Sequence, residues 1–261
     1  MEQTKDKPQS SDDGGRTLAI IEAALAMPRT KVDRSAFLHD QLRSHCSERQ
    51  VELAIEFNPA FARIPVTTID RIADSVIRSQ NFKAAAGSFV TGMPGGIAMA
   101  VTVPLDLAQN TGHALVLAQK LAYLYGWPEL FQEGAPDEET QSRMAMLLGS
   151  MLGLRQANIL LSEISSRFAS QVASRLPRYA LTKTAYYPVI KEICKWLGIK
   201  LTKTTFAQGV AKLIPVVSGG ISGALTGVVQ RKMAHRLKNH LRELEFAKPS
   251  QEKPTTIIID P

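Results

Sequence analysis

The sequence predicts an all-α protein, built as a single multi-helix bundle with a disordered tail at each end. Apolar residues recur at three- and four-residue intervals through most of the 261-residue chain, and no alternating segment longer than a few residues indicates a strand. Hydrophobic residues make up 44% of the chain, which is enough to bury one core of ordinary size. Residues 1–16 and 247–261 are polar or proline-containing, so we expect the helical domain to span residues 17–246.

The first part of the domain contains three short amphipathic stretches. Apolar residues at helical spacing predict helices over residues 17–27 and 31–46. A third helix is expected over residues 48–56. It has to end before Asn58-Pro59, because the residue ahead of a proline is pushed out of the helical region.

A proline and two polar residues mark the start of the next predicted helix. In the stretch that begins at Pro65, Thr67 is expected to act as the N-cap, and Asp70 stands three residues later at the capping-box position. The buried face of this helix is expected to consist of Ile69, Ile72, Ala73, Val76 and Ile77.

The second half of the domain is also expected to be helical. Carboxylates that follow Pro136 favour a helix start there, because negative charge in the first turn interacts well with the helix dipole. Pro215 separates the last two predicted helices. The predicted ranges are 155–175, 185–197, 203–213 and 216–245.

Residues 84–105 form the first of two long segments without a charged residue. The segment approaches the length needed to span a bilayer. Met93-Pro94-Gly95-Gly96 in its middle would break a single span, so we expect two short helices joined by a turn. Such a hairpin would be buried in the core or inserted shallowly in lipid.

Residues 213–230 form the second charge-free segment. Three of its glycines fall four residues apart and therefore lie on one face of a helix. Small residues on one face let another backbone come close, either in a soluble core or in lipid. The glycines predicted to allow close packing in the two segments are Gly95, Gly96, Gly219, Gly220, Gly223 and Gly227.

The second segment runs directly into a basic stretch. Between Arg175 and Arg242 the chain has thirteen Lys or Arg residues and one acidic residue, Glu192. This asymmetry indicates an anionic partner, either phospholipid headgroups or nucleic acid, or else a basic surface that only keeps the protein in solution. The residues predicted to bind a membrane are Arg231, Lys232, Arg236, Lys238 and Arg242.

Asp106, Asn110 and His113 fall on one face of the helix expected after Pro104. A carboxylate near an imidazole could relay protons or hold a metal, but no second His or Cys completes a ligand set. We therefore expect a buried, hydrogen-bonded polar cluster. The sequence has no motif for a nucleophilic serine, a nucleotide-binding loop or a zinc site, so it predicts no catalytic residue, metal or cofactor.

Three short motifs resemble those of the EcsC family of bacterial proteins. They are Met93-Pro94-Gly95-Gly96 followed by Asp106, then Ala122-Tyr123-Leu124-Tyr125-Gly126-Trp127, then Lys212-Leu213-Ile214-Pro215-Val216-Val217-Ser218-Gly219-Gly220. They are similar, in order, to the family's proline-glycine step, its "LYG" helix end and its "K-x-I-P-V-V-G" step, with Ser218 in place of glycine. The resemblance covers roughly residues 30–245. It implies an α-helical protein, often found near membrane transport or envelope functions, with no agreed catalytic mechanism.

The sequence therefore predicts a non-enzymatic, peripheral membrane or lipid-associated accessory protein, in an envelope, transport or cell-defence setting. Its glycine-rich helices would insert in lipid or bind an apolar ligand, and its basic helix would orient it on an anionic membrane surface. The N-terminus lacks a secretory-signal pattern and mean hydropathy is −0.06, so we expect a cytoplasmic protein at the inner face of the cytoplasmic membrane.

Three alternatives remain open at this stage. The basic region could bind nucleic acid, although the sequence has no helix-turn-helix, zinc or RNA-recognition signature. The chain could also be an enzyme centred on Asp106 and His113. A protein partner could also bind the β-prone residues 255–259 of the C-terminal tail by strand addition.

Overall fold

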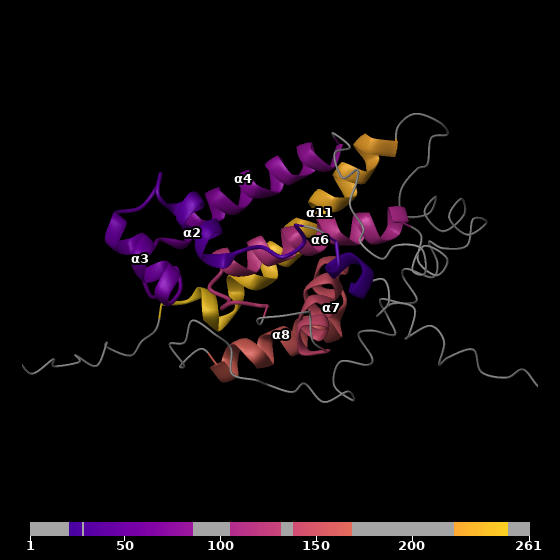
Figure 1. The fold of residues 1–261 in the computed structure, drawn as a ribbon. Helices are drawn as coiled ribbons and strands as arrows, with labels where there is room; N and C mark the ends of the chain where they lie inside the picture. The colour runs from indigo at the N-terminus through magenta and orange to yellow at the C-terminus, as the bar shows by residue number, and fades with distance from the viewer. Residues whose placement is uncertain (1–20, 28, 86–104, 132–137, 169–221, 250–261) are drawn as a thin grey trace, which may run out of the picture.

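The computed structural model describes residues 21–27, 29–85, 105–131, 138–168 and 222–249. Within these ranges the chain is helical and contains no extended strand, which confirms the all-α prediction (Figure 1). The helices are α2 (Arg34–Leu42), α3 (Glu48–Glu56), α4 (Val66–Ala85), α6 (Leu105–Leu124), α7 (Glu138–Leu152), α8 (Arg155–Phe168), α11 (Ser222–Glu243) and the 3-10 turn η1 (Glu245–Ala247).

The short N-terminal helices differ in how well the sequence predicts them. Helix α3 has the predicted bounds, and Ser47 and Gln50 form a capping box at its start. Helix α2 is shorter than the predicted range 31–46. It begins at Arg34 because the side chain of Asp33 accepts a hydrogen bond from the backbone N–H of Ala36, which fixes Asp33 outside the helix as its N-cap.

Helix α4 begins one residue before its predicted cap. The carbonyl oxygen of Pro65 accepts hydrogen bonds from the backbone N–H groups of Thr68, at 2.9 Å, and Ile69, at 3.2 Å, so Thr67 lies inside the first turn. The predicted Thr67 capping box is therefore wrong. The carboxylate of Asp70 is used elsewhere, since it accepts a hydrogen bond from the hydroxyl of Tyr125 at 2.6 Å.

The predicted helices of the second half lie only partly within the described ranges. Helix α7 begins at Glu138, close to the predicted start, and α8 occupies the first part of the range 155–175. The sequence predicts a single helix over 216–245. In the structure, α11 ends at Glu243 and the separate 3-10 turn η1 begins at Glu245. The predicted helices 185–197 and 203–213 lie outside the described residues.

Three long helices form the centre of the bundle. Helices α4, α6 and α11 all contact one another, α7 packs against α6 and α11, and α8 packs against α7 and η1. Helices α6 and α11 run opposite to α4. Asp70, at the start of α4, binds the hydroxyl of Tyr125, which comes just after α6, and the guanidinium of Arg242, which lies near the end of α11. Most of the buried residues that the structure describes are aliphatic or aromatic.

We call the two ends of this three-helix core the Trp127 end and the Arg231 end. At the Trp127 end α4 begins and α6 and α11 finish. Trp127 is fully buried there, and its ring stands edge-on to Phe246 with the ring centroids 5.2 Å apart. At the Arg231 end α4 finishes and α6 and α11 begin, as the right-hand side of Figure 1 shows.

Gly126 makes the turn at the Trp127 end. Its φ is +90°, and the backbone N–H groups of Gly126 and Trp127 bind the carbonyl oxygens of Tyr123 and Ala122, which is the Schellman pattern of a helix C-terminus. A Cβ atom at Gly126 would stand 2.2 Å from the carbonyl oxygen of Phe246. Glycine is therefore required both for the backbone conformation and for the close approach of the two chain segments.

A buried arginine fastens the N-terminal helices to this end. Arg34 is 3% exposed, and its guanidinium donates hydrogen bonds to four backbone carbonyl oxygens. Three of them belong to Ala54, Ile55 and Phe57 at the end of α3, and the fourth belongs to Trp127. Arg34 thus satisfies carbonyl groups that the end of a helix leaves without intrahelical partners.

Candidate membrane-facing surface

The basic residues of α11 divide into two groups along the helix. Near its C-terminal end, Nζ of Lys238 lies 2.6 Å from Oδ1 of Asp74, and Nε of Arg242 lies 2.9 Å from Oδ2 of Asp70. The two acidic residues are one turn apart on α4, and the two cations are one turn apart on α11. These pairs hold α11 against α4 in an antiparallel arrangement.

The protein also uses other basic groups of α11 in its own packing. Nη1 of Arg236 donates to the carbonyl oxygen of Leu152 at 3.3 Å, and Nε2 of His240 donates to the carbonyl oxygen of Asn158 at 3.1 Å. Burial lowers the pKa of His240 below its usual value, although the bond to Asn158 acts in the opposite direction.

These contacts revise the predicted set of membrane-binding residues. Lys238 is only 8% exposed and is bound to Asp74, so its ammonium group does not reach an outside surface, which corrects the prediction for this residue. Arg236 and Arg242 are exposed but engaged with the protein. Arg231 and Lys232 are exposed, and neither has an ion pair or side-chain hydrogen bond with another residue that the structure describes.

The helix register adds a cation that sequence reasoning missed. Arg78 lies one turn beyond Asp74 on α4, about 6 Å further along the axis at a rise of 1.5 Å per residue. Lys232 lies six residues before Lys238 on the antiparallel α11, about 9 Å in the same direction. Arg78 is exposed and has no ion pair within the described ranges. The exposed cations Arg78, Arg231 and Lys232 therefore lie at similar heights along the α4–α11 pair, beyond the two ion pairs in the direction of the Arg231 end, and we call them the basic cluster.

An exposed apolar side chain adjoins the basic cluster. Val228 is 63% exposed, the largest exposed fraction among the large hydrophobic residues that the structure describes. It lies three and four residues before Arg231 and Lys232, hence about one turn away on α11. An apolar side chain therefore lies about one turn from cations that have no partner among the described residues.

Both charge-free segments connect to this same end. The first, residues 84–105, joins the last residues of α4 to the first residue of α6. The second, residues 213–230, leads into α11 and includes its first turns. Because α4 finishes where α6 and α11 begin, two segments that are far apart in the sequence meet the bundle at one end, about 10 to 14 Å along α4 and α11 from the basic cluster.

The close-packing role of the glycines stays a prediction. Gly95, Gly96, Gly219 and Gly220 lie outside the described residues. Gly223 and Gly227 belong to α11, but what packs against them lies outside the described part of the structure.

The predicted polar cluster is tested only in part. Asp106, Asn110 and His113 all belong to α6, which agrees with their predicted helical spacing, but the side-chain surroundings of the first two lie outside the described part of the structure. His113 is half-buried, and burial lowers the pKa of its imidazole. Among the residues that the structure describes, no three His, Cys, Asp or Glu side chains are grouped closely enough to hold a metal ion.

No family model, curated protein or solved structure matches this chain. The resemblance to the EcsC family therefore stays a prediction, and the functional argument depends on the arrangement of the helices.

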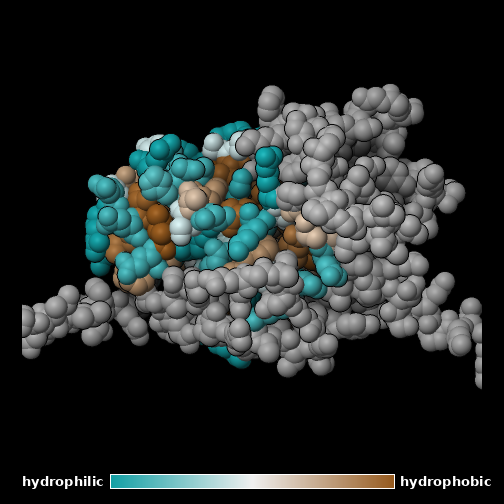
Figure 2. All heavy atoms as spheres, viewed as in Figure 1, coloured by the Kyte–Doolittle hydropathy of each residue, from teal (hydrophilic) through white to brown (hydrophobic). Residues whose placement is uncertain are grey.

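None of the described helices, over the residues that could be searched, is both long and apolar enough to cross a bilayer. On the face drawn in Figure 2, the described residues are mainly hydrophilic, and smaller hydrophobic areas lie between them without forming a continuous band.

Proposed function

We propose that this chain is a non-enzymatic, peripheral membrane protein that places its Arg231 end on an anionic bilayer. The observation that carries the proposal is that three helix ends and two charge-free segments meet at one end of the bundle, with the basic cluster about 10 to 14 Å from that end along α4 and α11. The opposite end supports this orientation, because Trp127, Gly126 and Phe246 close it by internal packing.

The basic cluster alone would give only weak attachment. A cation near an anionic leaflet contributes about 1 kcal/mol, so Arg78, Arg231 and Lys232 together would contribute about 3 kcal/mol. Apolar residues of the two charge-free segments would have to supply the remainder, at about 25 cal/mol for each Å² removed from water. Reversible binding that needs both contributions is typical of peripheral proteins.

The predicted relationship to the EcsC family agrees with this role. Its members are often found near membrane transport or envelope functions, and a helical protein that docks on the cytoplasmic leaflet would serve as an accessory there. We include this setting, and a role in cell defence, in the proposal.

Vesicle co-sedimentation tests the proposal directly. The full chain is mixed with vesicles of phosphatidylcholine alone or with added phosphatidylglycerol, and we expect it to sediment with the anionic vesicles. The double variant Arg231→Glu/Lys232→Glu removes two favourable charges and adds two repulsive ones, which should lower partitioning by at least about 30-fold. Arg78→Glu alone should lower it by about fivefold or more.

The matched control is Arg71→Glu. Arg71 is also an exposed arginine on α4, but it lies two turns from Arg78 toward the Trp127 end, so its reversal should leave partitioning nearly unchanged. Equal binding to neutral and anionic vesicles, or equal losses for Arg71→Glu and Arg78→Glu, would contradict the proposed orientation. Retention of DNA or RNA in a gel shift at low salt, without vesicle binding, would favour the nucleic-acid alternative.

A further inference from the structure

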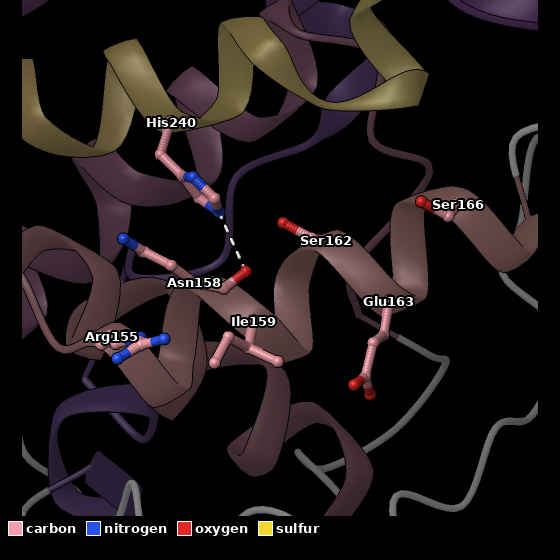
Figure 3. Close-up of a pocket in the computed structure, with 7 residues that line it drawn as sticks. All are labelled: Arg155, Asn158, Ile159, Ser162, Glu163, Ser166 and His240. Atoms are coloured by element: carbon pink, nitrogen blue, oxygen red, sulfur yellow. Dashed lines mark hydrogen bonds between the residues drawn. The ribbon is translucent and has the colours of Figure 1, made fainter.

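A shallow groove runs along α8, and His240 of α11 stands on one side of it (Figure 3). It has a volume of about 410 Å³ and is lined by Arg155, Asn158, Ile159, Ser162, Glu163, Ser166 and His240. Figure 3 shows that these side chains belong to two rows. The hydroxyl groups of Ser162 and Ser166 lie on the side of α8 that faces α11, and Ile159 and Glu163 point away from α11.

The outer row has an apolar centre between opposite charges. Arg155, Ile159 and Glu163 are spaced four residues apart, so they follow one another along one face of the helix. All three are exposed, and Ile159 is one of two large hydrophobic side chains that are exposed among the described residues, at 38%. Neither Arg155 nor Glu163 has an ion pair with another described residue.

This pattern is complementary to itself. If two copies of α8 lie antiparallel with Ile159 at the centre, Arg155 of each copy faces Glu163 of the other, because the two charges are equally distant from residue 159. A parallel arrangement would instead place Arg155 against Arg155 and Glu163 against Glu163. Two-fold symmetric interfaces require such a patch, in which residue i contacts j and j contacts i.

We infer that the partner of this face is a second copy of the chain, bound through antiparallel α8 helices about a two-fold axis at Ile159. Ile159 of each copy packs against that of the other and over the neighbouring groove, and two ion pairs between Arg155 and Glu163 flank it. This inference goes beyond the proposed membrane function and does not depend on it.

The small size of this face limits the affinity of the proposed dimer. Helix α8 has 14 residues and is therefore about 21 Å long. One pair of helices of this length buries less than the roughly 800 Å² per partner of a standard stable interface. The dimer accordingly belongs to the weak class, so it forms at high protein concentration.

Analytical ultracentrifugation over about 1 µM to about 1 mM tests the inference. The wild-type chain should shift from monomer to dimer across this range. Arg155→Glu alone, or Glu163→Arg alone, replaces two attractive pairs by two repulsive ones and should weaken association at least about tenfold. Both residues are exposed, and a glutamate at the first position of α8 suits the helix dipole, so both variants should remain folded by circular dichroism.

Mixing the two single variants provides the decisive result. The Arg155→Glu chain carries two acids in the row, and the Glu163→Arg chain carries two cations, so the mixture should form heterodimers although neither variant self-associates. The double variant Arg155→Glu/Glu163→Arg should also regain wild-type association. Arg71→Glu, an exposed charge reversal on another helix, should have no effect.

Three results would overturn the inference: a wild-type chain that stays monomeric throughout, single variants that associate as wild type does, or a mixture that associates no better than its components. Loss of association in Ile159→Asp without recovery in the mixture would indicate that this apolar face binds something other than α8 of a second copy. Vesicle binding by a monomeric chain would leave the proposed membrane function standing, which separates the two tests.

Discussion

Replacement of Gly126 by alanine should destabilise the protein more than the same change at Gly153. The two glycines occupy equivalent positions, because each is the left-handed residue of a Schellman motif, with φ of +90° at Gly126 and +84° at Gly153. An alanine in this region costs about 1 to 2 kcal/mol from its backbone conformation alone. This cost should be nearly equal at the two sites.

The surroundings of the new Cβ atom differ sharply. At Gly153 the nearest atom would be Nη1 of Arg236 at 3.5 Å, which is an ordinary contact with a flexible side chain. At Gly126 the nearest atoms would be the main-chain oxygen of Phe246 at 2.2 Å and its carbonyl carbon at 3.0 Å. The backbone of Phe246 would have to move, which disturbs its ring contact with Trp127 and adds about 1 to 3 kcal/mol.

We therefore expect losses in the free energy of unfolding of about 1 to 2 kcal/mol for Gly153→Ala and about 2 to 5 kcal/mol for Gly126→Ala. Equilibrium urea unfolding followed by far-ultraviolet circular dichroism measures both values, and the m-value should not change. Equal destabilisation within about 0.5 kcal/mol would refute the argument, because it would mean that Phe246 does not lie against Gly126 in solution.

Two further predictions concern buried polar groups. Arg34→Met should lower the free energy of unfolding by about 3 kcal/mol, because four carbonyl oxygens lose charged donors, and Arg34→Lys should recover only part of it, as thermal and urea unfolding would show. Burial lowers the pKa values of His113 and His240 in the folded chain, so protonation of either imidazole favours the unfolded chain. The free energy of unfolding should therefore keep its full value above about pH 6.5, the ordinary pKa of histidine, and should decrease as the pH falls below that value. His240→Gln should reduce this slope without abolishing it, and an unchanged slope would mean that His240 is solvated.

Local sequence rules predict the elements that local contacts determine. The bounds of α3 follow from a cap before it and Asn58-Pro59 after it, both within a few residues of the helix. The predicted capping box at Thr67 was wrong because it assigned Asp70 to its own helix. The partners of Asp70 are Tyr125 and Arg242, which lie 55 and 172 residues further along the chain, so no local pattern could reveal them.

The same limit applies to the candidate membrane surface. The run of cations on α11 is visible in the sequence, but nothing local distinguishes Lys238 from Arg231. Lys238 is buried because Asp74 of α4 binds it, whereas Arg231 is exposed. Arg78 stands among mixed charges in the sequence. Its height along the helix pair, close to that of Arg231 and Lys232, depends on the register between α4 and α11, which two ion pairs fix.

The acidic residues of α4 also give the helix pair an electric asymmetry. Asp70 and Asp74 neutralise cations toward the Trp127 end, whereas Arg78, Arg231 and Lys232, which lie further toward the Arg231 end, stay uncompensated by any described residue. The N-termini of α6 and α11 add partial positive charge at that end, against one C-terminus from α4. In the field of an anionic surface this dipole produces a torque that turns the molecule before contact, and the torque weakens as salt shortens the Debye length below about 10 Å.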